Sequence, residues 1–277
     1  MGEPGPEERW LEVNGVKLHY LEWGDHARQP MILLHGFLGH ARVWDDFALS
    51  SKRDYHVLAL DQRGHGQSQW AADGAYSLDD YFSDLAEFIK LLGLNNLILV
   101  GHSMGGRNAL FYTACLPDRV NRLILVDARA AASQRSTMAL NDLLNRIRLE
   151  SGTLEEMIQE AQAAYPSLSR ETCHRLIIHA CQVTAGARLI PRYDVRMKQM
   201  AERPGFILED LRPLMGNITC LTLVIRGEES LFLSRLEAEE MCQLMQNAEW
   251  TEISAASHLP VQENPTAFKE AVSSFLD

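Results

Sequence analysis

Short apolar runs alternate with helix-length amphipathic patterns in the first half of the chain. The runs expected to form strands are Met31–Leu34, His56–Leu60, Leu97–Val100 and Leu123–Val126. The helical patterns between them are Val43–Ala48, Leu78–Leu92 and Met104–Cys115. Because buried parallel strands read as short apolar runs and need helical crossovers, this alternation predicts an α/β fold with a mostly parallel sheet covered by helices on both faces.

The start of the chain predicts a hairpin instead. Asn14 and Gly15 lie between the expected strands Trp10–Val13 and Val16–Glu22. This dipeptide accepts the positive φ angles of a tight turn, so we expect the two strands to pair in an antiparallel manner.

The alternation of strands and helices stops at Arg129 and resumes after about Met215. The patterns in between are helical, with no strand expected among them: Ser136–Glu150, Thr153–Ala164 and Ser169–Thr184. The later elements are a strand at Leu221–Ile225, a helix over Ser234–Met245, a strand at Glu249–Ile253 and a helix over Pro265–Phe275. We therefore expect a sheet domain of residues 1–128 and 216–277 with a helical insertion of residues 129–215, although the length of 277 residues also fits two separate domains.

A serine in a glycine-rich turn is the first candidate for chemistry. The strand Leu97–Val100 leads into Gly101–Gly106 (GHSMGG), and a helical pattern starts at once. The pattern Gly-x-Ser-x-Gly suits a sharp strand-to-helix turn, where glycines leave room for a strained backbone that presents the serine hydroxyl. The alternative is a glycine-rich turn with an idle serine, but the position between strand and helix favours a nucleophile at Ser103.

A serine hydroxyl needs a base to become a nucleophile, so the chain must also supply a histidine. Of its ten histidines, His258 lies between the last expected strand and the last expected helix, where a loop reaches the carboxyl edge of the sheet. His35, His65 and His102 adjoin glycine turns in earlier loops, and we expect them to shape those loops through hydrogen bonds. The remaining histidines show no metal-ligand spacing with acidic support. His258 is therefore the expected base.

Further segments make the chain similar to the α/β-hydrolase-fold enzymes over nearly its full length. Leu33–Phe37 (LLHGF) resembles the loop after the family's third strand, and Asp61–Ser68 (DQRGHGQS) is similar to its D-x-R-G-x-G-x-S turn. The order of Ser103, an acid and His258 also matches the family. The resemblance implies an α/β-hydrolase fold and the activity of a serine hydrolase.

The same resemblance implies where a substrate binds. The backbone amides of Phe37 and Met104 would form the oxyanion hole. The side chain of Phe37 would then point toward the acyl pocket, and burial in the core of its loop is the alternative. An insertion that leaves the sheet at the carboxyl end of a strand must cross that edge, so we expect residues 129–215 to form a cap over the site. Further candidates for the cavity walls are Trp44, Met138, Tyr165 and Tyr193, although such side chains in helices more often belong to the core.

The acid is the point at which this chain departs from the commonest family pattern. Many members carry it in a G-x-x-D turn after the penultimate strand, where this chain has Gly227–Ser230 (GEES). Asp127 follows the strand Leu123–Val126, and in some esterases of the family the acid lies after that strand. We therefore expect Asp127 to be the acid, with Glu229 as the alternative and Glu228 as the third candidate. A helix cap at the start of the insertion is the structural alternative for Asp127.

These residues predict two-step acyl transfer, in which Ser103 attacks a carbonyl, His258 moves the proton and Asp127 orients the imidazole. The expected substrate is a carboxylic ester, or an ester-like acyl compound, of small size, and no metal or organic cofactor is implied. Lactonases, thioesterases and C–C bond hydrolases share the same groups, so the bond type stays open. A ligand receptor without turnover is the alternative from another class, and the intact serine and histidine weigh against it.

Charge narrows the range of partners. Lys and Arg total 26 and Asp and Glu total 37, and the net charge of −11 opposes binding to nucleic-acid phosphates and anionic membranes. Residues 1–9 lack the basic and apolar segments of a secretory signal, and no run approaches the roughly 18 apolar residues of a membrane span. We therefore expect a cytoplasmic protein with no nucleic-acid or membrane partner, while its oligomeric state stays open.

Overall fold

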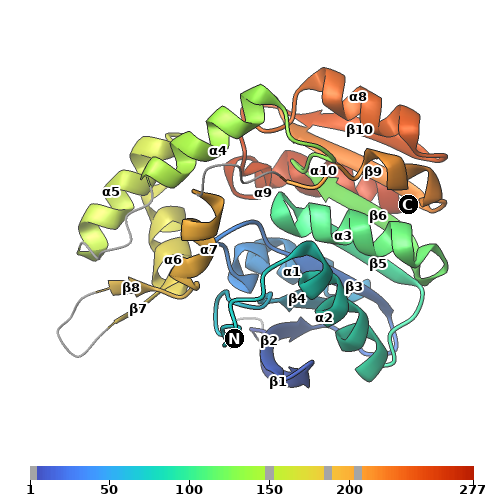
Figure 1. Ribbon diagram of the computed structural model, residues 1–277, viewed down its shortest axis with the longest axis horizontal. Coiled ribbons are helices and arrows are strands. Elements are labelled where there is room, and N and C mark those ends of the chain that lie inside the picture. The colour runs from blue at the N-terminus through green and yellow to red at the C-terminus, as the bar shows by residue number, and fades with distance from the viewer. Residues whose placement is uncertain (1–4, 147–152, 184–188, 203–207) are drawn as a thin grey trace.

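The computed structural model describes residues 5–146, 153–183, 189–202 and 208–277. Its main feature is an eight-stranded sheet with the strand order β1-β2-β4-β3-β5-β6-β9-β10 (Figure 1). The strands are β1 (Glu7–Val13), β2 (Val16–Trp23), β3 (Gln29–Leu34), β4 (Tyr55–Leu60), β5 (Leu97–His102), β6 (Val120–Val126), β9 (Leu221–Gly227) and β10 (Ala248–Ile253). Neighbours from β4 to β10 in this order are parallel, whereas β2 is antiparallel to both β1 and β4. The predicted α/β fold class is therefore confirmed.

The hairpin at the start of the chain has the predicted turn. Asn14 and Gly15 have φ angles of 49° and 76°, and Val13 pairs with Val16 across the turn. The hairpin adds an antiparallel edge to a sheet whose other strands run parallel.

The central strands are buried on both faces, because their side chains alternate between two apolar clusters. In β5, Leu97 and Leu99 belong to one cluster, and Ile98 and Val100 belong to the other. The first face is covered by α2 (Leu78–Leu91), α3 (Met104–Cys115) and α8 (Arg235–Leu244), and the second by α1 (Asp45–Ser51), α9 (Pro260–Glu263) and α10 (Pro265–Leu276). Short 3-10 helices are present at η1 (Ala41–Trp44), η2 (Pro117–Arg119) and η3 (Arg212–Asn217). Within the described ranges, no helix combines the length and the hydrophobicity needed to cross a bilayer.

The chain between β6 and β9 forms a group of helices on one side of the sheet, drawn in yellow-green to gold in Figure 1. It contains α4 (Gln134–Arg146), α5 (Leu154–Ala164), α6 (Arg170–Ala180) and α7 (Val195–Ala201). It also contains an antiparallel pair of strands, β7 (Cys181–Val183) and β8 (Leu189–Pro191). The expectation of helices without strands is therefore wrong here. The predicted ends of two helices, at Glu150 and Thr184, lie outside the described residues.

The helix predicted over Ser169–Thr184 ends early because the chain returns alongside it. Cys181 has extended backbone angles, with φ −127° and ψ 160°. The backbone N–H of Arg192 donates to the carbonyl of Ala180 at 2.7 Å, and its side-chain Nε donates to the carbonyl of Cys181 at 2.9 Å. These bonds take the place of a further helical turn. Strands of three residues are too short to give an alternating pattern that the sequence could reveal.

Candidate active site

Ser103 lies on the turn between β5 and α3, at the carboxyl edge of the sheet. Its φ of 51° and ψ of −113° fall in a region that residues with a side chain rarely adopt. The turn is so tight that a Cβ at Gly101 would overlap the carbonyl oxygen of Gly105, and a Cβ at Gly105 would overlap that of Leu34. The two glycines therefore allow the backbone to hold Ser103 in this strained conformation.

His258 and Asp127 reach Ser103 from two further loops at the same edge. Asp127 directly follows β6, and His258 lies between β10 and α9. Nε2 of His258 lies 3.1 Å from Oγ of Ser103, and its Nδ1 lies 2.6 Å from Oδ2 of Asp127. Asp127 is only 1% exposed, so water competes little for this contact. With the proton on Nδ1, the other ring nitrogen is free to accept the proton of the Ser103 hydroxyl.

The carboxylate of Asp127 is fixed by the turn after β9, the turn in which the sequence lacks the commonest acid. Ser230 Oγ donates to Oδ2 of Asp127 at 2.6 Å, and the backbone N–H of Gly227 donates to Oδ1 at 3.2 Å. Both glutamates of this turn, Glu228 and Glu229, are exposed. The structure therefore brings Asp127 to the imidazole and leaves the two alternative acids at the surface. With its oxygens bonded in this way, Asp127 does not serve as a helix cap.

Three other histidines at this edge are buried and bonded to the backbone. Nε2 of His35 and Nε2 of His65 accept hydrogen bonds from backbone N–H groups of neighbouring loops, at 3.0 and 3.2 Å. Nε2 of His102 lies 2.7 Å from the carbonyl oxygen of His258. Burial lowers the pKa of His35 and His102 to about 3 and that of His65 to about 4. These histidines stay neutral near neutral pH and shape the loops, in line with the expectation.

The loop after β3 lies directly against the nucleophile turn. A Cβ at Gly36 would come within 3.2 Å of Cβ of Ser103. Phe37, the next residue, and Met104, the first residue of α3, both line the cavity that contains Ser103. The two residues predicted to supply oxyanion amides therefore both lie at the cavity that contains Ser103.

A cavity of about 440 Å³ contains Ser103. Loops and helices of the sheet part contribute Phe37 and Tyr81 to its wall. Leu140 of α4 and two methionines of α7, Met197 and Met200, come from the insertion. Both parts of the chain thus form one cavity, and its largely apolar wall with a few polar groups is typical of a small-molecule site.

Four other side chains that the sequence suggested for the cavity do not line it in the described structure: Trp44, Met138, Tyr165 and Tyr193. Trp44 is fully buried in the core of the sheet domain, and Met138 is 65% exposed. Tyr165 packs against a small apolar cluster within the insertion, and Tyr193 packs behind residues of the cavity wall such as Tyr81 and Met197 without lining the cavity itself. The cavity interpretation is wrong for all four, and the alternative of a core residue is right for Trp44, because hydrophobic character does not say which surface a side chain faces.

Several residues at the cavity carry no signal that singled them out in the sequence. The ring of Phe232 stacks on that of His258, with 3.9 Å between centroids and 21° between planes. The guanidinium carbon of Arg129 lies 5.9 Å from the Phe232 centroid, and Arg107 also lines the cavity. Lone arginines and phenylalanines form no motif. Ser230 differs, since its place at the usual acid position of the turn could have identified it.

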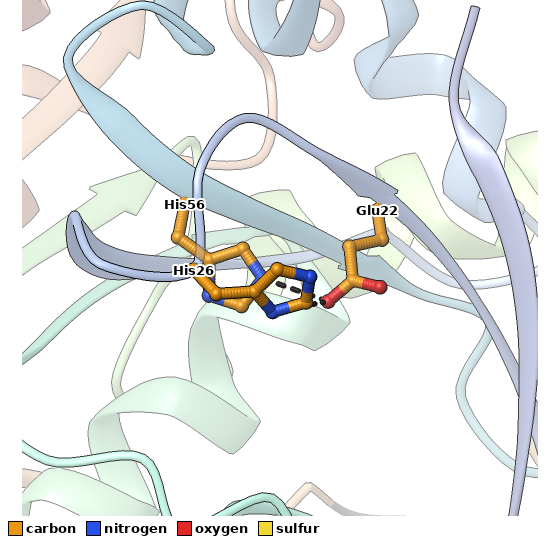
Figure 2. Close-up of side chains that lie close together, drawn as sticks. All are labelled: Glu22, His26 and His56. Atoms are coloured by element: carbon orange, nitrogen blue, oxygen red, sulfur yellow. Dashed lines mark hydrogen bonds and ion pairs between the residues drawn. The ribbon is translucent and has the colours of Figure 1, made fainter.

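One group of side chains away from this edge has donors arranged to hold a metal ion. Glu22 of β2, His26 of the following loop and His56 of β4 point toward one another, with ligand atoms within 4.8 Å (Figure 2). Oε1 of Glu22 lies 2.7 Å from Nε2 of His56 and 3.6 Å from Nδ1 of His26. Two imidazoles and a carboxylate suit zinc. The sequence showed no such spacing, because the antiparallel pairing of β2 with β4 creates the group at the amino edge of the sheet, opposite Ser103.

Known proteins resemble this chain along nearly its whole length. The sequence profile of the α/β hydrolase fold matches residues 29–265. The chain is 28% identical to 2-(acetamidomethylene)succinate hydrolase of Mesorhizobium japonicum, over 97% of this chain and 95% of that one. It is also 28% identical to an esterase of Mycobacterium tuberculosis, over 100% of this chain and 92% of that one. A solved α/β hydrolase from Novosphingobium aromaticivorans is 25% identical, with a TM-score of 0.87 and 99% of each chain covered. The chain is therefore a hydrolase that belongs to the α/β-hydrolase fold family.

Proposed function

We propose that the protein is a serine hydrolase that cleaves a carboxylic ester, or a similar acyl bond, in a small molecule. The observation that carries this proposal is the hydrogen-bonded series of Asp127, His258 and Ser103 at a largely apolar cavity. A buried carboxylate, an imidazole and a hydroxyl in this order are the groups that acyl transfer through a covalent intermediate needs.

The reaction begins when Oγ of Ser103 attacks the carbonyl carbon of the substrate, while Nε2 of His258 takes the hydroxyl proton. The imidazolium gives this proton to the leaving alkoxide, and the acyl group stays on Ser103. A water molecule that loses a proton to His258 then attacks the acyl group, and the acid leaves as Ser103 regains its proton. Asp127 keeps the proton on Nδ1 and stabilises the imidazolium.

The negative charge that develops on the substrate oxygen in both steps is assigned to the backbone N–H groups of Phe37 and Met104. N–H groups in the first turn of a helix lack partners within that helix, and Met104 begins α3. The absence of a side chain at Gly36 lets the loop that carries Phe37 approach the nucleophile turn closely. Donors held by the backbone in this way need no rearrangement as the charge forms.

Residues 1–128 and 216–277 are proposed to form the catalytic domain, and residues 129–215 the cap that selects the substrate. Support comes from Leu140, Met197 and Met200 of the insertion, which line the cavity that contains Ser103. The insertion also leaves the sheet directly after Asp127, at the edge where functional side chains of a parallel sheet gather.

An ester is the bond that we propose first, because the similar protein of Mycobacterium tuberculosis is an esterase and is aligned with the whole of this chain. The relative from Mesorhizobium japonicum is a hydrolase of 2-(acetamidomethylene)succinate. Lactones, thioesters and carbonyl-activated C–C bonds can be cleaved by the same groups, so a substrate panel has to include them.

Covalent labelling and ester turnover test the proposal together. The protein should react with a fluorophosphonate probe, which labels a serine activated by a base, and should hydrolyse p-nitrophenyl esters. Ser103→Ala should abolish labelling and lower kcat by about three to six orders of magnitude. Ser274→Ala removes an exposed hydroxyl on α10 and should change neither measurement.

The same panel identifies the preferred bond through lactones and acyl thioesters offered beside the esters. Wild-type protein that is neither labelled nor active on any member of the panel would contradict the proposal. Retention of more than about a tenth of the activity by Ser103→Ala would move the nucleophile elsewhere.

A further inference from the structure

One buried cation at the cavity has a nitrogen for which the described part of the chain offers no hydrogen-bond partner. Arg129 lines the cavity that contains Ser103, and the residue is only 8% exposed. Among the described residues, nothing bonds to Nε of its guanidinium. A guanidinium taken out of water without a partner is costly, so proteins normally pair it with a carboxylate or a carbonyl. Arg129 therefore has unused bonding capacity at the cavity.

The acidic side chains near Arg129 are already engaged. Asp127 is bonded to the imidazole and to the hydroxyl of Ser230. Glu237 accepts hydrogen bonds from the backbone N–H and the hydroxyl of Ser234, each at 2.7 Å. Burial lowers the pKa of Arg129 even though the charges of Glu237 and Asp127 oppose the shift. The protein itself thus leaves the charge of this guanidinium incompletely balanced.

Arg107 is the other buried arginine at the cavity, and its guanidinium differs from that of Arg129 in having several hydrogen-bond partners. Its guanidinium donates to the carbonyl oxygens of Arg129, Ala130 and Glu209 at distances of 2.7 to 3.1 Å. The carboxylate of Glu209 lies 3.8 Å away. The donors of Arg107 therefore tie the segment after β6 to the end of the insertion, a structural role. Arg129 has no comparable set of bonds among the described residues.

Arg129 lies close to the groups that are proposed to react. Its guanidinium carbon is 5.9 Å from the centroid of Phe232, whose other neighbour is the ring of His258 at 3.9 Å. The ring of Phe232, which lines the cavity with Arg129, thus contacts both the guanidinium and the imidazole. A group bound to the guanidinium would share the cavity of about 440 Å³ with Ser103, which suits a compact ligand.

We propose that Arg129 binds a carboxylate of the substrate, so that this enzyme acts on compact acyl compounds that carry a negative charge. The proposal rests on the proposed function, since it takes Ser103 as the nucleophile. A guanidinium presents two parallel N–H groups that match the oxygens of a carboxylate, which an ammonium cannot do. Because the net charge of the chain is −11, attraction for an anion has to come from such a local cation.

A matched pair of esters tests this charge preference. Mono-4-nitrophenyl glutarate and 4-nitrophenyl pentanoate are similar in length, but only the first carries a free carboxylate. We expect kcat/KM of wild-type protein to be about 10- to 100-fold higher for the glutarate ester, the effect that a hydrogen bond to a charged group provides. A second pair, 3-acetoxybenzoate and phenyl acetate, places the carboxylate on the leaving group instead.

Substitutions of Arg129 show whether its guanidinium causes any preference for the esters that carry a carboxylate. Arg129→Met should abolish the preference, so that the two esters of a pair are cleaved with kcat/KM values within about threefold of each other, whatever the change in absolute rate. Arg129→Lys should retain part of the preference, because it keeps the charge and loses the two parallel donors. Arg28→Met removes an exposed arginine before β3 and should behave like wild-type protein. A preference that is absent from both ester pairs, or that survives Arg129→Met, overturns the proposal.

Binding of glutarate gives a measurement that does not depend on turnover. In Ser103→Ala, glutarate should raise Tm in a concentration-dependent manner, and the rise should vanish in the double variant with Arg129→Met. If the serine is labelled and neutral esters are cleaved, but neither preference nor stabilisation by glutarate is seen, the carboxylate site is wrong and the proposed function stands. If glutarate stabilises the protein through Arg129 but no serine is labelled and no ester is cleaved, the proposed function fails instead.

Discussion

The sheet domain and the insertion use their buried side chains differently. β5 is buried along its whole length, and the strands beside it send side chains into apolar clusters on both faces. The insertion has a small apolar cluster of its own, whose buried members are Ile158, Leu168, Cys173, Ile177, Cys181 and Leu189. Leu140, Met197 and Met200 of the insertion line the cavity instead. The groups proposed to react thus lie on the domain with the large hydrophobic core. Part of the cavity wall comes from the insertion, whose hydrophobic core is smaller.

This difference separates two kinds of substitution. Changes at the strand ends of the sheet domain should affect the reaction itself, because they move or remove a reacting group. Changes on the cavity side of the insertion should affect which substrate is accepted, because they alter shape without touching Ser103.

The largest expected effect comes from the acid of the sheet domain. Asp127→Asn should lower kcat by about 10⁴-fold, because an amide cannot hold the imidazole in the tautomer that accepts the serine proton. Glu229→Gln should change kcat by less than about threefold, since this side chain is exposed. Ester hydrolysis under saturating substrate measures both variants.

Asp127 is buried and bonded three times, so a melting curve has to show that Asp127→Asn is folded at the assay temperature. The opposite ranking of the two variants would place the acid in the turn after β9. It would also contradict the comparison of the sheet domain with the insertion, because the hydrogen bonds of Asp127 would then not identify the residue that acts as the acid.

The second prediction concerns the insertion. Leu140→Ala, Met197→Ala and Met200→Ala should change the ratio of kcat/KM between short and long acyl esters by roughly 10- to 200-fold, the range that the fit of a methylene group in a pocket allows. Labelling of Ser103 by a small fluorophosphonate should persist in all three. Leu244→Ala, a partly exposed leucine on α8, is the matched control and should keep the wild-type ratio. An unchanged acyl-length profile in every cavity variant would mean that the insertion is a lobe without a role in substrate choice.

The smallest expected effect is on the free energy of unfolding. It comes from three buried histidines in loops of the sheet domain. Burial lowers the pKa of His35 and His102 to about 3 and of His65 to about 4, whereas unfolded imidazoles titrate near 6.5. Below about pH 6.5 the unfolded chain therefore binds more protons, and the free energy of unfolding falls as the pH falls. We expect a loss of about 1 kcal/mol for each buried imidazole between about pH 7 and about pH 5.5.

Urea unfolding at both pH values measures this loss. His65→Gln should reduce the difference between the two pH values by the contribution of one imidazole, whatever its effect on stability at neutral pH. An identical pH dependence in the variant would show that His65 is accessible to protons in the folded protein.

Much of the fold was predictable because its signals are local and repeated. The apolar run Leu97–Val100 marks a strand buried on both faces, and the tight turn at Ser103 needs the glycines that make its motif visible. The positions of Ser103 and His258 at one sheet edge follow from the parallel order of the strands. The predicted roles of these residues await the experiments above.

Other features depend on packing that no local pattern reveals. Trp44 resembles a cavity aromatic in the sequence, yet it is fully buried in the core beside Phe268 of α10, far along the chain. Arg129 reads as an ordinary charged residue until the fold buries it beside the cavity. The cluster of His26 and His56 exists only because two strands pair across the sheet edge. Such features come from long-range contacts and need the structure.

The hydroxyl of Ser230 has a consequence for how chains of this kind are identified from their sequences. It occupies the position at which many members carry the acid, and it donates to the carboxylate of Asp127 at the end of β6. The turn after β9 and the end of β6 therefore meet at one carboxylate, which is bonded to the imidazole of His258. A genome survey that demands an acid after the penultimate strand would discard this chain as a degenerate copy. A survey that accepts either strand end would keep it among the hydrolases.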